Sequence, residues 1–356
     1  MNALELASRF ALPGQVVAVE PLGGGLINAT FRVSTDRSCG VLQRINRRVF
    51  PRPERILANL RRLQHHWNGL PAADLRLPRL VPTREGEDWI EDDTGEYWRM
   101  LEYLDGVTIT KIKTYQVAEA LGASLGHFHR LLAGMDCSGW DDPLPGFHVT
   151  PSYLAALERA RLGWGGQKSK TLASLFDWIT KLRSWACGLD QARRSGRLPL
   201  RIVHGDPKLD NLLFDSKTSK PLAWVDLDTV GPGLVHYDIG DCLRSVCHEA
   251  GGFELDLIEK VLTGWLAELN GLLSPEEIRW VPHAIALLPF ELGVRFLTDY
   301  LEGNRYFKVS DPEQNLNRAL EQFALARQAL RQQRLLRKLW RKLTRAPGRS
   351  ASGPPT

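Results

Sequence analysis

The chain has 356 residues, a formal net charge of +5 and 43% hydrophobic residues, values that exclude a wholly disordered or fibrous protein. A single hydrophobic core stops growing near roughly 250–300 residues, so we expect two lobes. The five cysteines include no Cys-x-x-Cys pair, which argues against a disulfide framework or structural zinc and favours a reducing compartment. The chain has neither an uninterrupted apolar run of membrane-spanning length nor a start that resembles a signal peptide. We therefore expect a cytoplasmic protein.

The positive charge is concentrated near the C-terminus. Nine basic residues and no acidic ones lie between Arg327 and Arg349, so the rest of the chain is mildly acidic and is not expected to bind nucleic acid. Leucines and Trp340 recur there at helical spacing, a pattern typical of helices that contact anionic membranes or nucleic acid. We favour a solvated helical extension over residues 331–356 that ends in a disordered tail.

The first hundred residues have the pattern of a small β-rich lobe. Val19 and Thr30 belong to two predicted strands joined by a glycine-rich turn, and Pro53 suits the first position of a helix. The predicted elements are strands at 15–19, 30–34 and 41–45, a helix at 53–67, and a hairpin around 93–95 formed by segments 89–90 and 98–104.

After Gly106 the apolar spacing becomes mainly helical. We expect an N-terminal lobe at residues 1–103, a connector near 101–106 and a C-terminal lobe at 104–330. The predicted elements are helices at 115–132, 151–162 and 171–193, short strands at 201–203, 212–214 and 222–225, and helices from 255 onward. The layout predicts a mixed α+β fold with a small β-rich lobe and a larger, mainly helical lobe.

The most informative motif runs from His204 to Asn211 and reads His-Gly-Asp-Pro-Lys-Leu-Asp-Asn between two short strands. Phosphoryl transfer to a hydroxyl needs a carboxylate beside the hydroxyl proton and oxygen ligands for a metal ion. A catalytic-loop Asp followed by an Asn supplies that pair. We predict Asp206 as the catalytic residue and Asn211 as a metal ligand. Lys208 either stabilises charge on the transferring group or faces solvent.

A second acidic motif follows the next predicted strand, in the order Asp226-Leu227-Asp228. Magnesium favours one or two carboxylates together with phosphate oxygens, so Asp226 is placed to bridge Mg²⁺ and nucleotide phosphates. The alternative is that these acids are ordinary turn residues. That reading accounts for single positions but not for the joint order of both motifs.

Together the two motifs resemble the aminoglycoside phosphotransferase and choline kinase superfamily. The resemblance implies a bilobal protein-kinase-like fold, with ATP and Mg²⁺ as cofactors, and spans about residues 22–327. Four stretches further resemble the N-acetylhexosamine 1-kinases: GGGLINAT at 23–30, VLQRIN at 41–46, DLDTVGPGLVHYDIGD at 226–241 and GVRFLTDYLEGNRYFK at 293–308.

The glycine turn is a candidate phosphate-binding loop. Gly23, Gly24 and Gly25 let backbone N–H groups approach phosphates closely. The protein-kinase loop is Gly-x-Gly-x-x-Gly, and Asn28 replaces its last glycine here. A simple glycine hairpin turn would have the same appearance.

Three further residues are assigned to nucleotide binding. Arg44 stands on the third strand where kinases carry a phosphate-binding Lys, and a guanidinium grips phosphate well. The alternative interpretation is that Arg44 is an ordinary exposed arginine on the strand. Glu54, in the following helix, is one candidate for an ion pair with Arg44, although several other arginines compete for it. The resemblance implies that the backbone at Glu102 and Leu104 hydrogen-bonds the adenine. The Tyr103 ring either contributes to this adenine site or packs in the core.

The resemblance implies that the acceptor is the anomeric hydroxyl of an N-acetylhexosamine or a related hexose. Asp228, Arg244 and Arg295 are the predicted acceptor ligands, and Asp238 is expected to support the catalytic loop. A kinase for choline, another amino alcohol or an aminoglycoside is the first alternative, although such cations favour an acidic or aromatic cage. A nucleotide-binding pseudoenzyme with a membrane- or RNA-binding tail is the second. It is disfavoured because Asp206 and both metal ligands are intact.

Overall fold

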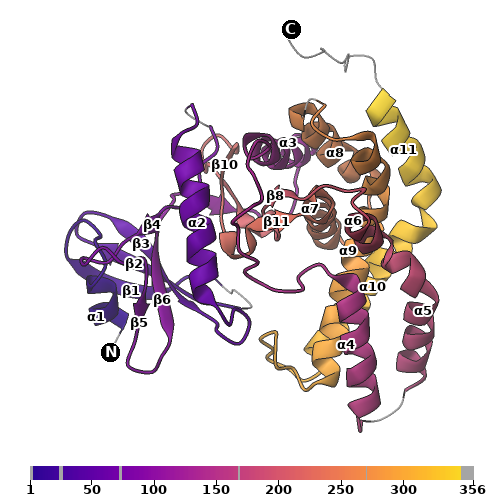
Figure 1. Ribbon diagram of the computed structural model, residues 1–356, viewed down its shortest axis with the longest axis horizontal. Coiled ribbons are helices and arrows are strands. Elements are labelled where there is room, and N and C mark those ends of the chain that lie inside the picture. The colour runs from indigo at the N-terminus through magenta and orange to yellow at the C-terminus, as the bar shows by residue number, and fades with distance from the viewer. Residues whose placement is uncertain (1–2, 24–26, 72–73, 167–168, 270, 346–356) are drawn as a thin grey trace.

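A computed structural model describes residues 3–23, 27–71, 74–166, 169–269 and 271–345 of the chain. Figure 1 shows a sheet region built from the N-terminal third and a larger helical region built from the remainder. The α+β architecture predicted from the sequence is therefore confirmed.

The N-terminal region is a six-stranded antiparallel sheet with the order β1-β2-β3-β6-β4, and β5 pairs with β6. The strands are β1 (Val16–Pro21), β2 (Ala29–Thr35), β3 (Cys39–Ile45), β4 (Leu80–Val81), β5 (Ile90–Glu91) and β6 (Tyr97–Glu102). One face of the sheet packs against α1 (Ala3–Ser8) through a small cluster that includes Phe10, Leu42 and Met100. The other face is directed toward the helical region.

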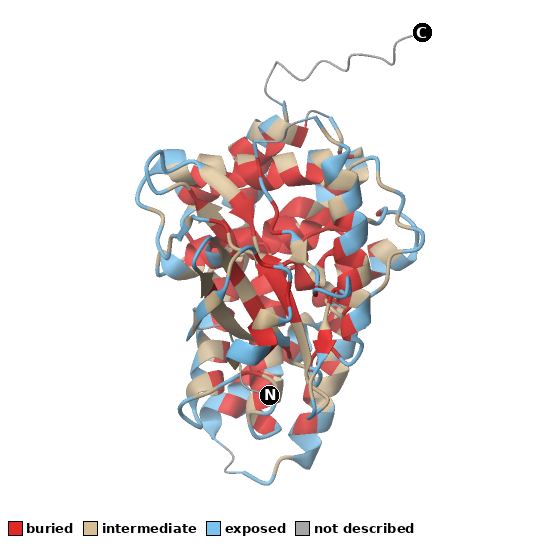
Figure 2. Ribbon diagram, turned by 90° about the vertical axis from the view of Figure 1, so that its left-hand side faces the viewer, coloured by how far each residue is buried: buried red, intermediate tan, exposed pale blue. Residues whose placement is uncertain are grey.

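Helix α2 (Pro53–Asn68) joins the sheet to the rest of the protein. Ile56, Leu60 and Leu63 share its buried face, as their helical spacing predicts. They belong to the same hydrophobic cluster as Leu121 and Ile239 of the helical region. A single core therefore extends across the connection between the two regions, and Figure 2 shows the buried residues running through both.

The chain passes between the regions directly after β6. Strand β7 (Val107–Thr108) pairs with β9 (Leu212–Phe214), which follows the His204–Asn211 motif, and β9 pairs with β10 (Pro221–Trp224). Strand β8 (Arg201–Val203), which precedes the motif, pairs with β11 (Gly231–Gly233). The two predicted chemical motifs are therefore carried by short strands wedged between the sheet and the helices.

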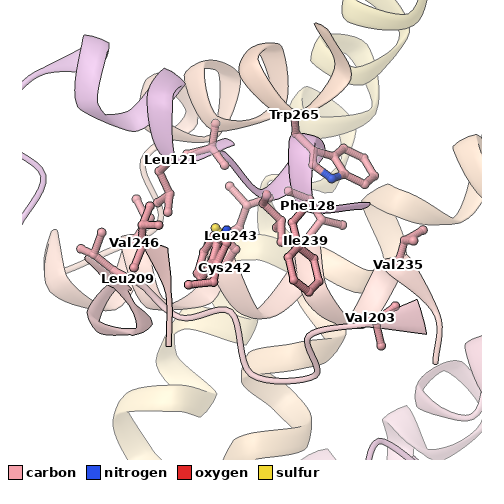
Figure 3. Packing of buried hydrophobic residues seen from close by; sticks show 14 of the residues in the cluster. Leu121, Phe128, Val203, Leu209, Val235, Ile239, Cys242, Leu243, Val246 and Trp265 are labelled. Atoms are coloured by element: carbon pink, nitrogen blue, oxygen red, sulfur yellow. The ribbon is translucent and has the colours of Figure 1, made fainter. Parts of the chain in front are cut away.

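Two helix pairs pack most closely in the helical region: α3 (Tyr115–Leu131) with α8 (Leu255–Leu269), and α9 (Pro275–Leu301) with α10 (Gln314–Arg331). The other helices of this region are α4 (Thr150–Gly163), α5 (Lys170–Ala186), α6 (Gly188–Arg194), α7 (Val235–Glu249) and α11 (Gln333–Arg345). Glycines let α3 and α8 approach closely, since a Cβ at Gly122 would lie 1.9 Å from the Val261 carbonyl oxygen. Figure 3 shows Phe128 of α3 and Trp265 of α8 packed with Ile239 of α7.

Two sequence predictions differ from the structure. The helix predicted at 171–193 is two helices, α5 and α6, interrupted at Cys187. Helix α7 was missed because nearly all of its side chains from Val235 to Cys247 are buried and Leu234 gives no side-chain cap at its start. Several of its buried residues are polar, among them His236, Asp238 and Asp241, so its polar positions do not mark the exposed face on which a periodicity argument depends.

Helix α9 is long and apolar enough to cross a membrane by length and composition, but 78% of its most apolar window is buried inside the protein. Packing against α4, α7 and α10 accounts for this composition. The helix begins with a capping box between Ser274 and Glu277.

The basic extension is the helix α11, as predicted, but it is docked rather than free. Leu336 is fully buried, and the Trp340 indole Nε1 donates a hydrogen bond to the Ile278 carbonyl oxygen at 2.7 Å. The tail after Arg345, predicted to be disordered, lies outside the described residues.

Candidate functional site

One buried carboxylate fixes the backbone of the loop formed by residues 204–211, which we call the catalytic loop. Asp238 of α7 accepts backbone N–H groups from His204 and Gly205, each at 2.8 Å. Gly205 has a φ of +87°, and a Cβ there would lie 2.8 Å from the Thr229 carbonyl oxygen, so glycine is required by both backbone and space. The predicted supporting role of Asp238 is confirmed by these contacts.

Asp238 is itself fixed by a chain of buried side chains. The His129 Nε2 lies 2.8 Å from the Asp238 carboxylate, and the Trp265 Nε1–H donates to His129 Nδ1 at 3.1 Å. This arrangement assigns the proton on His129 to Nε2. His127, two residues earlier, contacts Glu268 instead, so the two histidines lie on different faces of α3 as their spacing predicts.

Asp206 lies at the open end of this loop, with about 30% of its side chain exposed. Its Oδ2 accepts from Lys208 Nζ at 3.0 Å and from Asn211 Nδ2 at 3.2 Å. Burial opposes ionisation, but the Lys208 ammonium outweighs it and lowers the pKa of Asp206. Asp206 is therefore an ionised carboxylate at neutral pH.

Asn211 and Asp226 lie on two segments that are hydrogen-bonded to each other. The Asn211 Nδ2 is bonded to the Asp206 carbonyl oxygen at 2.7 Å, which leaves its amide oxygen available. The Val225 N–H donates to the Asn211 carbonyl oxygen at 2.9 Å, so the second acidic segment is tied directly to the first. Asp226 is a non-glycine residue in left-handed conformation, with φ of 60°, and its side chain is exposed to the cleft.

Asp226 lies among charges of both signs. Burial raises the pKa of Asp226 to about 7, the negative charges of Asp228 and Asp206 add to this, and the positive charges of Lys208 and Arg99 oppose it. Among the described residues no group of three or more His, Cys, Asp or Glu side chains surrounds a metal position. One carboxylate and one amide oxygen fit magnesium, which usually completes its shell with phosphate oxygens and water.

Asp228, predicted to bind the acceptor, has a different role in the structure. Its side chain is 4% exposed and pairs with Arg99 of β6, whose side chain is 1% exposed. Asn28 Nδ2 donates to its other oxygen at 2.7 Å, and Arg99 also donates to Gln43 of β3. Both Asp228 oxygens are thus bonded to the sheet region, and the residue joins the two regions instead of facing a substrate.

The prediction that Arg44 binds phosphate disagrees with its placement. On β3 and β6, Arg44 pairs with Trp98 and shares a face with Leu42, whereas Gln43 pairs with Arg99 on the face toward Asp228. Arg44 is exposed and lies over the Trp98 ring at 5.9 Å. Because successive strand residues point to opposite faces, a one-residue difference in register moves the cation out of the site.

The Arg99 Nη1 atom is buried and has no hydrogen-bond partner among the described residues. No motif in the sequence marked this arginine as functional. The sequence does place Arg99 inside an apolar strand, Trp98-Arg99-Met100-Leu101. A charge in such a strand is expected to be buried and to need a partner, and this pattern could have identified Arg99.

The remaining nucleotide-site residues are placed only in part. Gly23 has the left-handed φ of +70° that suits a glycine turn, while Gly24 and Gly25 lie outside the described residues. Glu102 ends β6, and its carboxylate is paired with two arginines, Arg76 at 2.8 Å and Arg79 at 3.0 Å.

The Glu102 N–H donates to the Arg79 carbonyl oxygen at 2.7 Å, so this amide is already bonded. Leu104 is buried in the connector. Tyr103 is covered by Arg32, 4.8 Å from its ring centre. Adenine contacts by the connector backbone stay a prediction.

A wall of aromatic side chains surrounds Arg295 of α9 on the helical side of the site. The guanidinium lies 5.2–5.5 Å from four ring centres, those of Phe147, Tyr153, Tyr306 and Phe307. Its Nη2 donates to the Tyr306 hydroxyl at 3.2 Å. Within the described part of the chain, no carboxylate forms an ion pair with it.

Arg295 nevertheless lies within electrostatic reach of the catalytic loop. Burial opposes its charge, but the neighbouring tyrosines and the carboxylates of Glu291 and Asp206 hold the pKa of Arg295 above its ordinary value. The group is therefore a permanent cation whose charge is not matched by a direct partner. It is suited to bind an oxygen-rich or anionic part of a ligand.

Arg244, the third predicted acceptor ligand, is already paired. Its Nε donates to Asp241 at 2.6 Å, and both side chains are 9% exposed. The other Asp241 oxygen is buried without a partner among the described residues. Arg244 therefore orients Asp241 through its Nε, while neither of its two Nη atoms forms a hydrogen bond with a described residue.

His148 and Glu291 form a further part of this wall that sequence reasoning missed. His148 has a φ of 55°, its Nδ1 lies 2.7 Å from Glu291, and its Nε2 lies 3.1 Å from the Gly205 carbonyl oxygen. The Glu291 carboxylate raises the pKa of His148 despite burial. Since these residues come from the loop before α4 and from α9, no local motif brings them together.

Comparisons with known proteins agree with this geometry. Residues 18–267 match the model of the phosphotransferase enzyme family. A homoserine kinase of Paramagnetospirillum magneticum is 24% identical over 299 residues, which covers 80% of each chain.

Two solved structures share the fold. An aminoglycoside phosphotransferase from Alicyclobacillus acidocaldarius matches 96% of this chain and 97% of its own, with a TM-score of 0.66 and 15% identity. A microcompartment-associated aminopropanol kinase matches 93% of this chain and 97% of its own, with a TM-score of 0.59 and 19% identity.

Proposed function

Because this chain belongs to the phosphotransferase enzyme family, we propose that it is an ATP- and Mg²⁺-dependent kinase for a sugar hydroxyl. The proposed acceptor is the anomeric hydroxyl of an N-acetylhexosamine or a related hexose. The observation that carries the proposal is the joint placement of Asp206, Asn211 and Asp226 at the open end of a rigid loop.

In this mechanism Asp206 accepts a hydrogen bond from the acceptor hydroxyl, orients its oxygen toward the γ-phosphorus and takes its proton as the bond to phosphorus forms. Lys208 holds the Asp206 carboxylate at 3.0 Å and adds positive charge beside the transferring group. An anomeric hydroxyl is more acidic than an ordinary alcohol, which favours this proton transfer.

Asn211 and Asp226 would hold Mg²⁺, which neutralises charge on the phosphate oxygens when it is bound. The elevated pKa of Asp226 supports this assignment, because burial and the neighbouring carboxylates Asp228 and Asp206 together disfavour its charge, which a bound cation would stabilise.

Arg99 is proposed as the positioning residue that the sheet region contributes in place of Arg44. It holds Asp228 two residues beyond Asp226, and its charge lowers the pKa of Asp226. Loss of the Arg99 charge would therefore move the metal-binding segment and weaken the link between the sheet and the catalytic loop.

The proposed acceptor is neutral rather than cationic. A choline, amino-alcohol or aminoglycoside kinase favours an acidic or aromatic cage for the cation, and here the four aromatic rings surround Arg295 instead. Here Glu291 is already bonded to His148 and Thr150, whereas Arg295 presents an unpaired positive charge. Because the Arg295 guanidinium repels a cationic acceptor, it supports an acceptor with carbonyl or hydroxyl oxygens, such as an acetamido sugar.

A hydroxy amino acid is the second candidate. Its carboxylate would pair with the Arg295 guanidinium, and the unpartnered oxygen of Asp241 would bind its ammonium. The name of the homoserine kinase relative points in the same direction.

The test is ADP release by the purified protein with Mg-ATP and a panel of acceptors. The panel contains N-acetylglucosamine, N-acetylgalactosamine, glucose, galactose, homoserine, choline and kanamycin, with Asp206→Asn as the control. Turnover with a hexosamine that is lost in the variant supports the proposal. Turnover with homoserine alone replaces the sugar by the second candidate, and turnover with choline or kanamycin alone contradicts the role of Arg295.

A further inference from the structure

An open cavity of about 750 Å³ lies on the side of the helical region where α11 docks. It is bordered by the end of α5, the first turns of α9 and the outer half of α11. Its walls contain three tryptophans, Trp185, Trp280 and Trp340. None of its lining residues belongs to the catalytic loop, to the Asp226 segment or to the wall around Arg295. It is therefore a separate site with an apolar, aromatic interior.

One polar atom inside this lining has no partner. The His283 Nε2 is buried and makes no hydrogen bond to any described residue. Its ring is packed between two tryptophans, 4.7 Å from Trp185 and 5.1 Å from Trp280. Burial, with help from His236 and Arg337, lowers the pKa of His283 to about 4, so the ring is neutral. The lining therefore contains a neutral imidazole with one nitrogen that no described residue satisfies.

The rim of the cavity carries positive charge. Arg279 of α9 and Arg337 and Arg341 of α11 all line it. Arg279 is paired with Glu276 at 2.6 Å. Arg337 and Arg341 are exposed, and no carboxylate in the described residues pairs with either of them. The charge of these two guanidinium groups is available to an anion at the mouth of the cavity.

The docking of α11 also excludes one explanation of its basic pattern. A helix that lies in a membrane surface inserts its apolar face. In this protein Leu336 and Trp340 are used for packing against the body, with exposed fractions of 0% and 4%. The outward face of α11 is mainly basic, Leu335 is its one exposed large apolar side chain among the described residues, and the cavity provides further apolar surface beside the helix.

We propose that this cavity binds an amphipathic organic anion, with an aliphatic or aromatic body among the tryptophans and a phosphate or carboxylate head on Arg337 and Arg341. The volume lies within the range of about 300–1,000 Å³ that is typical of small-molecule sites. An apolar interior with guanidinium groups on one side of its mouth matches that chemistry. The site is independent of the kinase reaction proposed above.

Dodecyl phosphate below its micelle concentration is the probe, and binding is followed by tryptophan fluorescence and by calorimetry. The double variant Arg337→Gln/Arg341→Gln should weaken binding at least about 10-fold, the cost of losing a charge-assisted hydrogen bond. The matched control Arg334→Gln/Lys338→Gln removes equal charge from exposed positions of α11 outside the lining and should change binding less than about 2-fold.

Thr344→Trp fills the cavity from its lining and should abolish binding while the thermal unfolding temperature is retained. Dodecyl maltoside and dodecyltrimethylammonium, which lack the anionic head, should bind at least about 10-fold more weakly. The proposal is overturned if dodecyl phosphate does not bind, if Thr344→Trp binds normally in a folded protein, or if both double variants lose affinity equally.

Vesicles distinguish the source of the anion. If vesicles of phosphatidylcholine with phosphatidylglycerol bind the protein and the Arg337→Gln/Arg341→Gln variant alone loses this binding, the ligand is a membrane lipid. If dodecyl phosphate binds but the vesicles do not, the ligand is a soluble amphiphile. Both results support the site.

Discussion

The catalytic loop differs in construction from the proposed acceptor site, which consists of the side chains around Arg295 together with His148 and Asp241. We call this second group the acceptor wall. The catalytic loop takes its chemistry from one segment, 204–211, and its support from Asp238 on α7. The acceptor wall takes His148 from the loop before α4, Asp241 from α7 and Arg295 from α9. In the proposed assignment, phosphoryl transfer is thus encoded locally, whereas the proposed acceptor site is assembled from side chains that are distant in sequence.

This difference explains why a family can keep one reaction and change its acceptor. The contacts of the loop are backbone amides on a carboxylate, and they leave little freedom for substitution. The wall around Arg295 consists of side chains from α4, α9 and the loops that precede α4 and follow α9, so its members come from separate segments of the chain. The predictions below test whether the two parts can be separated by mutation.

The largest effect is expected from Asp206→Asn. Loss of the carboxylate that orients and deprotonates the acceptor should lower kcat by about 10²–10⁴, with the unfolding temperature unchanged. The matched control is Asp210→Asn, an exposed acid on the same loop, which should retain near-full activity. Steady-state kinetics with circular dichroism measures both. Near-full activity of Asp206→Asn would remove it as the base.

Arg99→Met should destabilise the protein by about 3–5 kcal/mol, because Asp228 is left as a buried charge without its partner. Urea unfolding measures this change. The double variant Arg99→Met/Asp228→Leu should be more stable than Arg99→Met alone, since it removes the orphaned charge. A loss below about 1 kcal/mol for Arg99→Met would contradict the link between the two regions.

Arg295→Gln should raise the KM for the acceptor at least about 10-fold while the KM for ATP is unchanged, because a charged hydrogen-bond donor to the acceptor is lost. Arg305→Gln removes an exposed charge next to Tyr306 and is the matched control. If the KM for ATP rises instead, Arg295 belongs to the nucleotide side and the proposed division between loop and wall is wrong.

Arg44→Gln should have the smallest effect, with the KM for ATP changed less than about 2-fold, because exposed charges contribute little. Its side chain lies on the sheet face away from Asp228. A rise of 10-fold or more in the KM for ATP would restore the phosphate-binding role that the register argues against.

The sequence predicted the elements whose signals are local. Periodicity located β1, β2, β3 and α2, and a loop motif brought Asp206, Lys208 and Asn211 together as expected. The Val225 N–H, next to Asp226, donates to the Asn211 carbonyl oxygen, so the two motifs that the sequence placed beside short strands are directly connected.

The errors arose where the answer depended on register or on long-range packing. The sequence does not show whether Arg44 or its neighbour Gln43 points toward the site, because that depends on which face of β3 is directed there. Asp228 resembled an acceptor ligand until Arg99, 129 positions earlier in the chain, was found beside it. His148 and Glu291 meet across 143 positions, so no spacing rule identifies them.

The most direct test of the account is proton-coupled phosphorus NMR of a reaction that contains the protein, Mg-ATP and N-acetylglucosamine. We predict that a phosphomonoester resonance, split by one anomeric proton, grows as fast as the γ-phosphate resonance of ATP declines, and that Asp206→Asn forms none. ATP that stays intact, or that yields only inorganic phosphate, would contradict transfer to a sugar hydroxyl.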